Sequence, residues 1–185
     1  MSALGADENS ASRFLRTKGI ADEELLRHPD AVVVRPSIVC TPGTMLSKKL
    51  LLLQKLCRFS GGILPFPRRM LETKLQPVAV EDLAELVSCL CAIEPMPKVV
   101  EVGGKEVYTL RQLLTLIPAC RKIIPFPQPV FDRLIPLLCR FFPSLIEKEQ
   151  QVLLQQDNIA KTRTCERLLG RTMTSTLAFW KSELA

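Results

Sequence analysis

The chain has 185 residues, a length that can bury a core of ordinary size and usually forms one domain. Hydrophobic residues make up 47% of it and charged residues 24%, a balance that excludes wholesale disorder. The formal net charge of +6 favours contact with anionic partners over contact with cationic ones.

The first residues, Met1–Glu8, show neither the basic region and apolar core of a secretory signal nor the acid-poor composition of a transit peptide. No targeting segment is therefore visible. The apolar segments Leu50–Leu53 and Leu134–Ile146 are too short or are broken by prolines and an arginine, so we expect no membrane-spanning helix.

Metal-binding residue types occur without the spacing of a metal site. The single histidine, His28, stands before Pro29 and is interpreted as a surface turn residue. Seven cysteines lack the paired short spacings of a zinc site, and we expect free, mostly buried thiols in a reducing compartment. They are Cys40, Cys57, Cys89, Cys91, Cys120, Cys139 and Cys165.

Ser12 is a plausible N-cap for a helix that carries Phe14 and Lys18. The β-branched run Val32–Val34 has no polar alternation, which predicts a strand of a parallel sheet, buried on both faces and ended by Pro36. Ligands of such sheets lie beyond the carboxyl ends of the strands, so Pro36–Val39 is expected at the mouth of a pocket. The helix would deliver Lys18 to the same site, although a solvated surface lysine is the alternative.

A second helix, amphipathic, is predicted over Met45–Phe59. Its apolar face comprises Leu46, Leu50, Leu53 and Cys57, and another face comprises Ser47, Gln54 and Arg58. From Met45 to Lys74 inclusive there are seven basic residues, against Glu72 as the one acidic residue. This concentration favours an acidic partner subunit, a nucleotide phosphate or an anionic membrane surface met through Lys48, Lys49 and Lys55, with a solvated basic face as the alternative. Nucleic acid is the least favoured partner because aromatic residues for base stacking are scarce there.

The remaining chain alternates strands and helices. Val78–Val80 is predicted as a strand entering a helix, whose first-turn acids Glu81 and Asp82 suit the helix dipole, and Val99–Val102 as a strand closed by Gly103-Gly104. The helix is expected to present Leu83, Val87 and Leu90 on one face. Beyond this helix, Thr109 and Gln112 form a capping box that starts a helix to about Ile117. We expect an extended connector over Lys122–Pro129. The further predicted helices cover Val130–Phe142, Ser144 to about Gln156, and two closing segments, 165–169 and 174–184.

The segment Ser12–Lys18, followed by Arg35-Pro36-Ser37-Ile38-Val39 and later by Gln76–Asp82 and Pro125-Phe126-Pro127, resembles a known family. In order and spacing these segments look like the C-terminal half of an atypical or extended short-chain dehydrogenase/reductase. The nearest likeness is to the NADPH-binding accessory subunit of respiratory complex I, NADH:ubiquinone oxidoreductase, and its bacterial relatives. The resemblance covers nearly the whole chain.

The resemblance implies a site for NADP(H). It gives Lys18 a hydrogen bond to the nicotinamide ribose, and Ser2 the place of the family's active-site serine, although we favour a processed or disordered terminus there. The cofactor-binding residues that it implies are Lys18, Pro36, Ser37, Ile38 and Val39, and the pocket-lining residues are Gln76 and Pro77.

Two departures from the family remove chemistry from this site. The family's catalytic tyrosine is replaced by Phe14, which has no ionisable group, so no catalytic residue is assigned. The Gly-rich turn that binds the cofactor pyrophosphate is absent, because Gly61-Gly62 and Gly103-Gly104 lack its spacing. Binding of NADP(H) is therefore in doubt.

We expect an α/β fold with an incomplete Rossmann-like parallel sheet, C-terminal strands only, and a mostly helical C-terminal part of the substrate-domain type. Residues 1–43 would be the rear of an NAD(P)-binding domain, 44–75 a basic helix and loop, 76–104 a strand, helix and strand returning to the sheet, and 105–185 the helical part.

The leading hypothesis is a truncated, non-catalytic relative that acts as a structural or assembly component of complex I. Its partners would be other complex I subunits, and its location by resemblance would be the matrix side of the mitochondrial inner membrane, or otherwise the cytoplasm. The rival hypothesis is an NAD(P)-dependent reductase or epimerase whose N-terminal half is missing from this chain. No metal is expected, and the substrate and the oligomeric state stay open.

Overall fold

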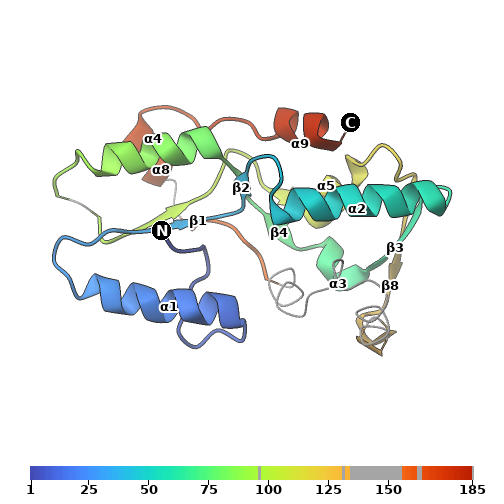
Figure 1. Ribbon diagram of the computed structural model, residues 1–185, viewed down its shortest axis with the longest axis horizontal. Coiled ribbons are helices and arrows are strands. Elements are labelled where there is room, and N and C mark those ends of the chain that lie inside the picture. Colours follow the sequence, from blue (N-terminus) through green and yellow to red (C-terminus); the bar gives the residue numbers. More distant parts are fainter. Residues whose placement is uncertain (96, 131, 134–155, 162–163, 185) are drawn as a thin grey trace. The chain divides into compact units, whose positions relative to one another are not determined.

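A computed structural model describes residues 1–184 with the exception of 96, 131, 134–155 and 162–163. The chain forms two compact units, each built from three separate stretches (Figure 1). Unit 1 consists of Met1–Thr41, Leu75–Val107 and Asn158–Thr176. Unit 2 consists of Pro42–Lys74, Tyr108–Asp157 and Leu177–Ala185.

Unit 1 alternates strands with helices. Its elements are α1 (Arg13–Leu26), β1 (Val33–Pro36), β2 (Val39–Cys40), β5 (Val78–Ala79), α4 (Val80–Leu90), β6 (Val99–Val102) and α8 (Thr164–Leu169). Strand β1 pairs with β6 in parallel from Val33 opposite Val99 to Pro36 opposite Val102, and β2 pairs with β5 in parallel. The predicted α/β class with parallel strands is confirmed.

Strand β1 is buried on both faces, as its unbroken β-branched run predicts. Val33 and Val34 point to opposite faces and are 2% and 8% exposed. Helices α1 and α4 lie on opposite sides of β1 (Figure 1). On the α4 side the core consists of Val34, Val78, Leu83, Leu86, Leu90, Val100, Val102, Cys165 and Met173. The periodicity placed Val87 on the buried face of α4, but Val87 is only partly buried. Leu86 is fully buried instead.

Unit 2 contains a second parallel pair. Its elements are α2 (Met45–Phe59), β3 (Ile63–Pro67), α3 (Arg68–Leu71), α5 (Leu110–Thr115), β8 (Lys122–Phe126) and α9 (Leu177–Leu184), with β4 (Lys74–Leu75) and β7 (Tyr108–Thr109) where the chain passes between the units. Strand β8 pairs with β3 from Ile63 opposite Lys122 to Pro67 opposite Phe126. The connector expected around Pro125 is thus extended, as predicted. It is not isolated, because it forms strand β8 and pairs with β3.

Local signals set the helix ends. The Ser12 hydroxyl accepts a hydrogen bond from the Leu15 N–H at 3.4 Å, and α2 has the predicted bounds. Thr109 and Gln112 form both halves of the predicted capping box. Gly170 has a positive φ of 65° directly after α8, a conformation that costs glycine least.

Burial on α2 differs from the prediction on one side. Leu50, Leu53 and Cys57 are buried as expected, but Ser47 and Gln54, placed on the polar face, are buried too. The Gln54 side-chain amide donates a hydrogen bond to the carbonyl oxygen of Leu184 at 2.9 Å, because α9 covers this side of α2.

Most of the predicted helices over Val130–Phe142 and from Ser144 to about Gln156 lie outside the described residues. Across the part of the chain that the structure describes, no helix combines the length and the apolarity needed to cross a bilayer.

Candidate functional site

The candidate site lies in unit 1 at the carboxyl ends of β1 and β6, where the sequence places the cofactor-facing residues. The Ser37 N–H donates to the Val102 carbonyl oxygen at 2.8 Å, so the parallel ladder continues one residue past Pro36. Ser37 is buried, and its hydroxyl donates to the side-chain oxygen of Asn158. The predicted mouth segment is therefore tied to a residue from the C-terminal stretch of unit 1.

Gln76 is the centre of this network. Its N–H donates to the Asn158 carbonyl at 3.0 Å, and its side-chain Nε2 donates to the Gly104 carbonyl at 2.7 Å. Its Oε1 accepts from the Ala160 N–H at 2.9 Å. The amide thus joins the loop after β6 to the chain beyond Asn158, which makes Gln76 a positioning residue for the rim of the site.

Gln76 packs against Gly103 and Pro77 against Gly104, the two glycines that follow β6. A β-carbon on Gly104 would lie 1.8 Å from the Pro77 carbonyl oxygen, and one on Gly103 would lie 2.3 Å from Oε1 of Gln76. Only glycine permits so close an approach of two backbones. The structure therefore brings together Ser37, Gln76 and Pro77, three of the predicted site residues.

Ile38 and Val39 continue from Ser37 into the second parallel pair. The Ile38 carbonyl accepts from the Val78 N–H at 2.9 Å, and Val39 stands opposite Val78. Cys40, the next residue, is buried, and burial together with the charge of Glu81 raises the pKa of its thiol to about 12. A thiol that stays protonated at neutral pH is a structural group and not a nucleophile.

Lys18 belongs to α1, which runs antiparallel to β1. Two contacts give this direction. Asp22 of α1 pairs with Arg35 of β1. Leu15, nearer the start of α1, contacts Gly5, and Gly5 follows Leu4, whose N–H donates to the carbonyl oxygen of Pro36 at the end of β1. Lys18 is half-buried one turn before Asp22, towards the carboxyl end of β1. Its contact with a cofactor ribose stays a prediction.

Phe14 stands one turn before Lys18 on α1 and is 46% exposed. The phenyl ring carries no proton that could be exchanged with a substrate. Phe14 contributes only its carbonyl oxygen to hydrogen bonding with Thr17, whose hydroxyl donates to it at 2.9 Å. That Phe14 occupies the place of the family's catalytic tyrosine stays a prediction.

The N-terminal segment is ordered, contrary to the disordered terminus that was one of the two alternatives that we favoured; the other, a processed terminus, stays a prediction. The Ser2 N–H donates to the Val34 carbonyl at 2.7 Å, and the Leu4 N–H donates to the Pro36 carbonyl at 2.9 Å. The Ser2 hydroxyl donates to Asp22, which is buried and also accepts from Arg35, each at 2.8 Å. Ser2 is therefore hydrogen-bonded to β1 through its backbone N–H, and its hydroxyl is engaged with Asp22.

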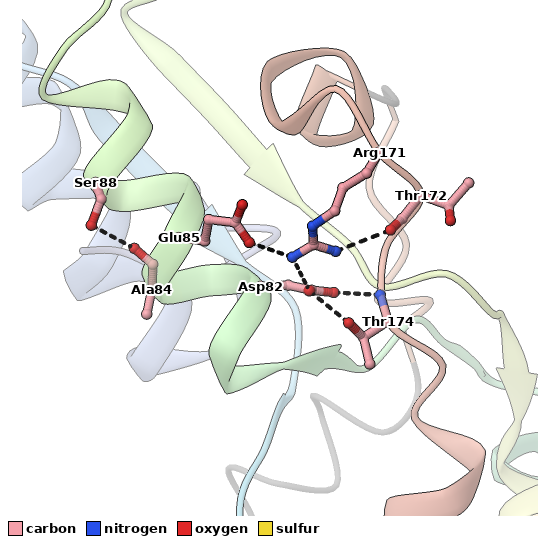
Figure 2. Close-up of polar contacts among 7 residues, drawn as sticks. All are labelled: Asp82, Ala84, Glu85, Ser88, Arg171, Thr172 and Thr174. Atoms are coloured by element: carbon pink, nitrogen blue, oxygen red, sulfur yellow. Dashed lines mark hydrogen bonds and ion pairs between the residues drawn. The ribbon is translucent and has the colours of Figure 1, made fainter.

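Two carboxylates of α4, Asp82 and Glu85, bind residues of the C-terminal stretch of unit 1 and together form a clamp on that stretch (Figure 2). Asp82 is buried and accepts from the N–H and the hydroxyl of Thr174 and from the Arg171 guanidinium, which also pairs with Glu85. Burial alone would raise the pKa of Asp82, but the hydrogen bonds from Thr174 and Arg171 outweigh it and hold that pKa below its usual value. The sequence predicted dipole compensation at Asp82 and did not predict this clamp.

The basic face predicted for membrane or partner contact lies on α2 of unit 2. Lys48 and Lys55 are exposed and Lys49 is half-buried. Contact of these lysines with lipid stays a prediction. His28 is exposed in the expected turn, and no group of three or more metal-ligating side chains occurs within the described ranges.

Among the six cysteines that the structure describes, all have free thiols, and Cys40, Cys57 and Cys165 are buried. Asn158 and Ala160 are the site residues that sequence reasoning missed. They stand far along the chain from Ser37 and Gln76, in a stretch without a motif, so no local signal points to them.

No family model matches the chain. It is 32% identical over 127 residues to the mitochondrial NADH dehydrogenase [ubiquinone] 1 alpha subcomplex subunit 9 of Arabidopsis thaliana, a match that covers 63% of this chain and 29% of that protein. The subunit of the same name from Dictyostelium discoideum is 34% identical over 120 residues, with 63% of this chain and 32% of that protein covered. Over these residues the chain is homologous to subunit 9. It spans about a third of the length of these relatives.

Solved structures show the same fold at low identity. A nucleoside-diphosphate-sugar epimerase from Staphylococcus aureus aligns with a TM-score of 0.66 at 13% identity, over 97% of this chain and 62% of that one. An NADPH-dependent quinone oxidoreductase from Escherichia coli, solved with NADPH, aligns with a TM-score of 0.62 at 16% identity, over 98% of this chain and 62% of that one. The parallel strand pairs thus resemble those of a Rossmann-like NAD(P)-binding fold, and the predicted relation to the complex I subunit is confirmed.

Proposed function

We propose that this chain is a non-catalytic structural or assembly component of respiratory complex I, with other complex I subunits as partners and the mitochondrion as its location. The proposal is supported by Phe14, which stands where the resemblance puts the family's proton-donating tyrosine, in a chain homologous to subunit 9. The chemistry of a carbonyl reductase needs an acid at that point, and a phenyl ring supplies none.

The rim of the site supports a scaffold role. The polar groups of Ser37 and Gln76 make hydrogen bonds to Asn158, Gly104 and Ala160 within unit 1. Such contacts hold loops in place at the ends of the strands, as a surface for protein contact requires. We infer that these residues keep the pocket-lining part of an NAD(P)-binding scaffold as a structural element.

The second candidate is an NAD(P)-dependent reductase or epimerase that needs an N-terminal half supplied by another segment. The observation in its favour is that Ser37, Gln76 and Pro77 are gathered at the strand ends where the family's cofactor lies. Lys18, Ile38 and Val39 would complete such a site. This alternative requires NADP(H), whereas the leading proposal does not.

Cofactor binding separates the two functions. The purified chain is titrated with NADPH by fluorescence, and NADPH oxidation is followed with quinone and carbonyl substrates. The leading proposal predicts no saturable binding and no oxidation above the protein-free rate. Saturable binding that Lys18→Ala weakens while the exposed control Lys55→Ala does not, together with turnover, would establish the enzyme instead.

A further inference from the structure

An open pocket of unit 2, with a volume of about 160 Å³, is lined by three cationic side chains. Its lining comes from α5, from the start of β8 and from the two residues before β8. The lining residues are Arg111, Thr115, Cys120, Arg121, Lys122 and Ile123. None of these six residues is acidic. The pocket therefore concentrates positive charge in a concave surface, and such a surface attracts anions.

Helix α5 positions Arg111 at the pocket. Arg111 and Thr115 are four residues apart on α5, a spacing that puts both side chains on one face of a helix. The capping box of Thr109 and Gln112 fixes the start of this helix. The guanidinium of Arg111 lies 3.4 Å from the carboxylate of Glu72, and both side chains are exposed. An exposed ion pair of this length is weak, so Arg111 keeps donors for another anion.

Gly62 fixes the backbone that carries the other two cations. Its carbonyl oxygen accepts hydrogen bonds from the N–H groups of Arg121 and Lys122 at 2.8 and 3.0 Å. A β-carbon on Gly62 would lie 2.8 Å from Cγ of Arg121, so the aliphatic stem of Arg121 lies against this glycine. Within the part of the chain that the structure describes, neither charged group has a hydrogen-bond or ion-pair partner. Both charges are therefore held at the pocket without a carboxylate to neutralise them.

We propose that this pocket is a binding site for a dianionic phosphate group. A phosphate monoester carries a charge of about −1.5 to −2 at pH 7, and its oxygens accept charge-assisted hydrogen bonds. The planar guanidinium groups of Arg111 and Arg121 suit the paired oxygens of such a group, and the Lys122 ammonium adds a point charge. A small phosphorylated compound and a lipid headgroup both offer this chemistry.

The inference concerns unit 2 and does not depend on the proposed role in complex I. None of the described residues that line the pocket is aromatic, so a nucleotide base finds no stacking partner there. NADPH is therefore expected to bind this pocket no more tightly than inorganic phosphate does. NADPH binding that depends on Lys18 still marks the enzyme and is distinct from phosphate binding here.

A titration of the full chain with inorganic phosphate tests the site. Binding is followed at low ionic strength by NMR, through the backbone amide signals of Arg121 and Lys122. Saturable shifts are expected, and added NaCl should weaken the binding. The wild-type titration alone decides whether phosphate binds, even where a variant fails to fold.

Variants assign the binding to the pocket. Arg111→Gln, Arg121→Gln and Lys122→Gln should each raise the dissociation constant about tenfold, the loss of one hydrogen bond to a charged group. Glutamine keeps the Cβ and Cγ atoms that lie against Gly62, so Arg121→Gln retains this packing. The matched control Lys48→Gln removes an exposed charge of α2 outside the pocket, and it should change the constant less than about twofold.

Cys120 gives a second readout at the same place, because it lines the pocket and is partly exposed. Saturating phosphate should slow its alkylation by iodoacetamide at least about threefold, since the anion covers the pocket and offsets the positive charge that favours the thiolate. Peptide mass spectrometry measures the rate. The exposed Cys91 of unit 1 is the internal control, and its rate should not change.

Vesicles separate the two sources of the phosphate group. The chain and its variants are sedimented with phosphatidylcholine vesicles that contain or lack phosphatidic acid. Sedimentation that requires phosphatidic acid and that the pocket variants weaken assigns a lipid headgroup, whereas phosphate binding without such sedimentation assigns a small phosphorylated compound. The proposal is overturned if inorganic phosphate gives no saturable shift, or if the three pocket variants bind it as tightly as Lys48→Gln does.

Discussion

The carbonyl oxygen of Pro77 lies 1.8 Å from the point that a β-carbon on Gly104 would occupy. Gly104→Ala should therefore destabilise the protein by about 3 kcal/mol, because two backbone segments must separate and overpacking has this scale of cost. The hydrogen bond from the Gly104 N–H to the Gln76 carbonyl would be strained as well. Urea unfolding of wild type and variant measures the difference.

Gly43→Ala is the matched control. Gly43 has a φ of 76°, but nothing lies within 4 Å of an added β-carbon, so only backbone strain of about 1 kcal/mol is expected. If Gly104→Ala cost no more than Gly43→Ala, the close packing of Pro77 on Gly104 would be wrong.

Asp82→Asn should lower the free energy of unfolding by about 2 kcal/mol at neutral pH, because an amide cannot accept all the bonds from Thr174 and Arg171. The pKa of Asp82 is lowered in the folded state, so its stabilisation is complete above the unfolded value of about 3.9 and is lost as the pH falls through the folded pKa. Wild type should thus lose more stability than the variant below pH 4.

Unfolding by urea at a series of pH values measures this difference. Glu81→Gln is the control, since Glu81 is an exposed acid in the same turn of α4. Parallel stability curves for wild type and Asp82→Asn between pH 5 and pH 2, in which range the carboxyl titrates, would contradict the assigned clamp.

Thr109→Ala should cost about 1 kcal/mol, because it removes the side-chain acceptor for the Gln112 N–H at the start of α5. Thr115→Ala is the control at the other end of the same helix, where the hydroxyl is exposed and donates to the Gln112 carbonyl. Thermal unfolding of the two variants should rank Thr109→Ala as the less stable. The reverse order would count against the capping box.

Phe14→Tyr should change stability by less than about 0.5 kcal/mol, because the ring is 46% exposed and gains only a hydroxyl. Under the leading proposal, the variant should produce no NADPH-dependent reduction of carbonyls or quinones, because that proposal assigns the chain a structural role. The assay follows NADPH absorbance with wild type and variant at equal concentration. Activity in the variant alone would mean that the acid was the one missing part.

Local features of this fold follow from the sequence, and its long-range contacts do not. The Ser12 cap, the capping box of Thr109 and the burial of β1 depend on neighbouring residues and were predicted. Burial of Gln54 could not be predicted, because its partner Leu184 belongs to α9 at the far end of the chain. A polar residue can be buried where a distant segment supplies its hydrogen-bond partner. The hydrophobic periodicity of a helix gives no information about such a distant segment.

The candidate site likewise contains residues that the sequence predicted and contacts that it did not predict. Ser37, Gln76 and Pro77 were predicted because their segments resemble a family, and the structure gathers them at the strand ends. Asn158 completes the network but carries no motif, and the Asp22 pair with Arg35 joins a helix to a strand across an intervening turn. Such contacts depend on tertiary packing.

Co-migration with complex I tests the central claim most directly. A tagged form of the chain is expressed in cells, mitochondria are solubilised in mild detergent, and native gel electrophoresis is followed by detection of the tag and of complex I subunits. The account predicts that the tagged chain migrates with complex I or with one of its assembly intermediates. Migration of all the tagged chain apart from every complex I species would contradict it.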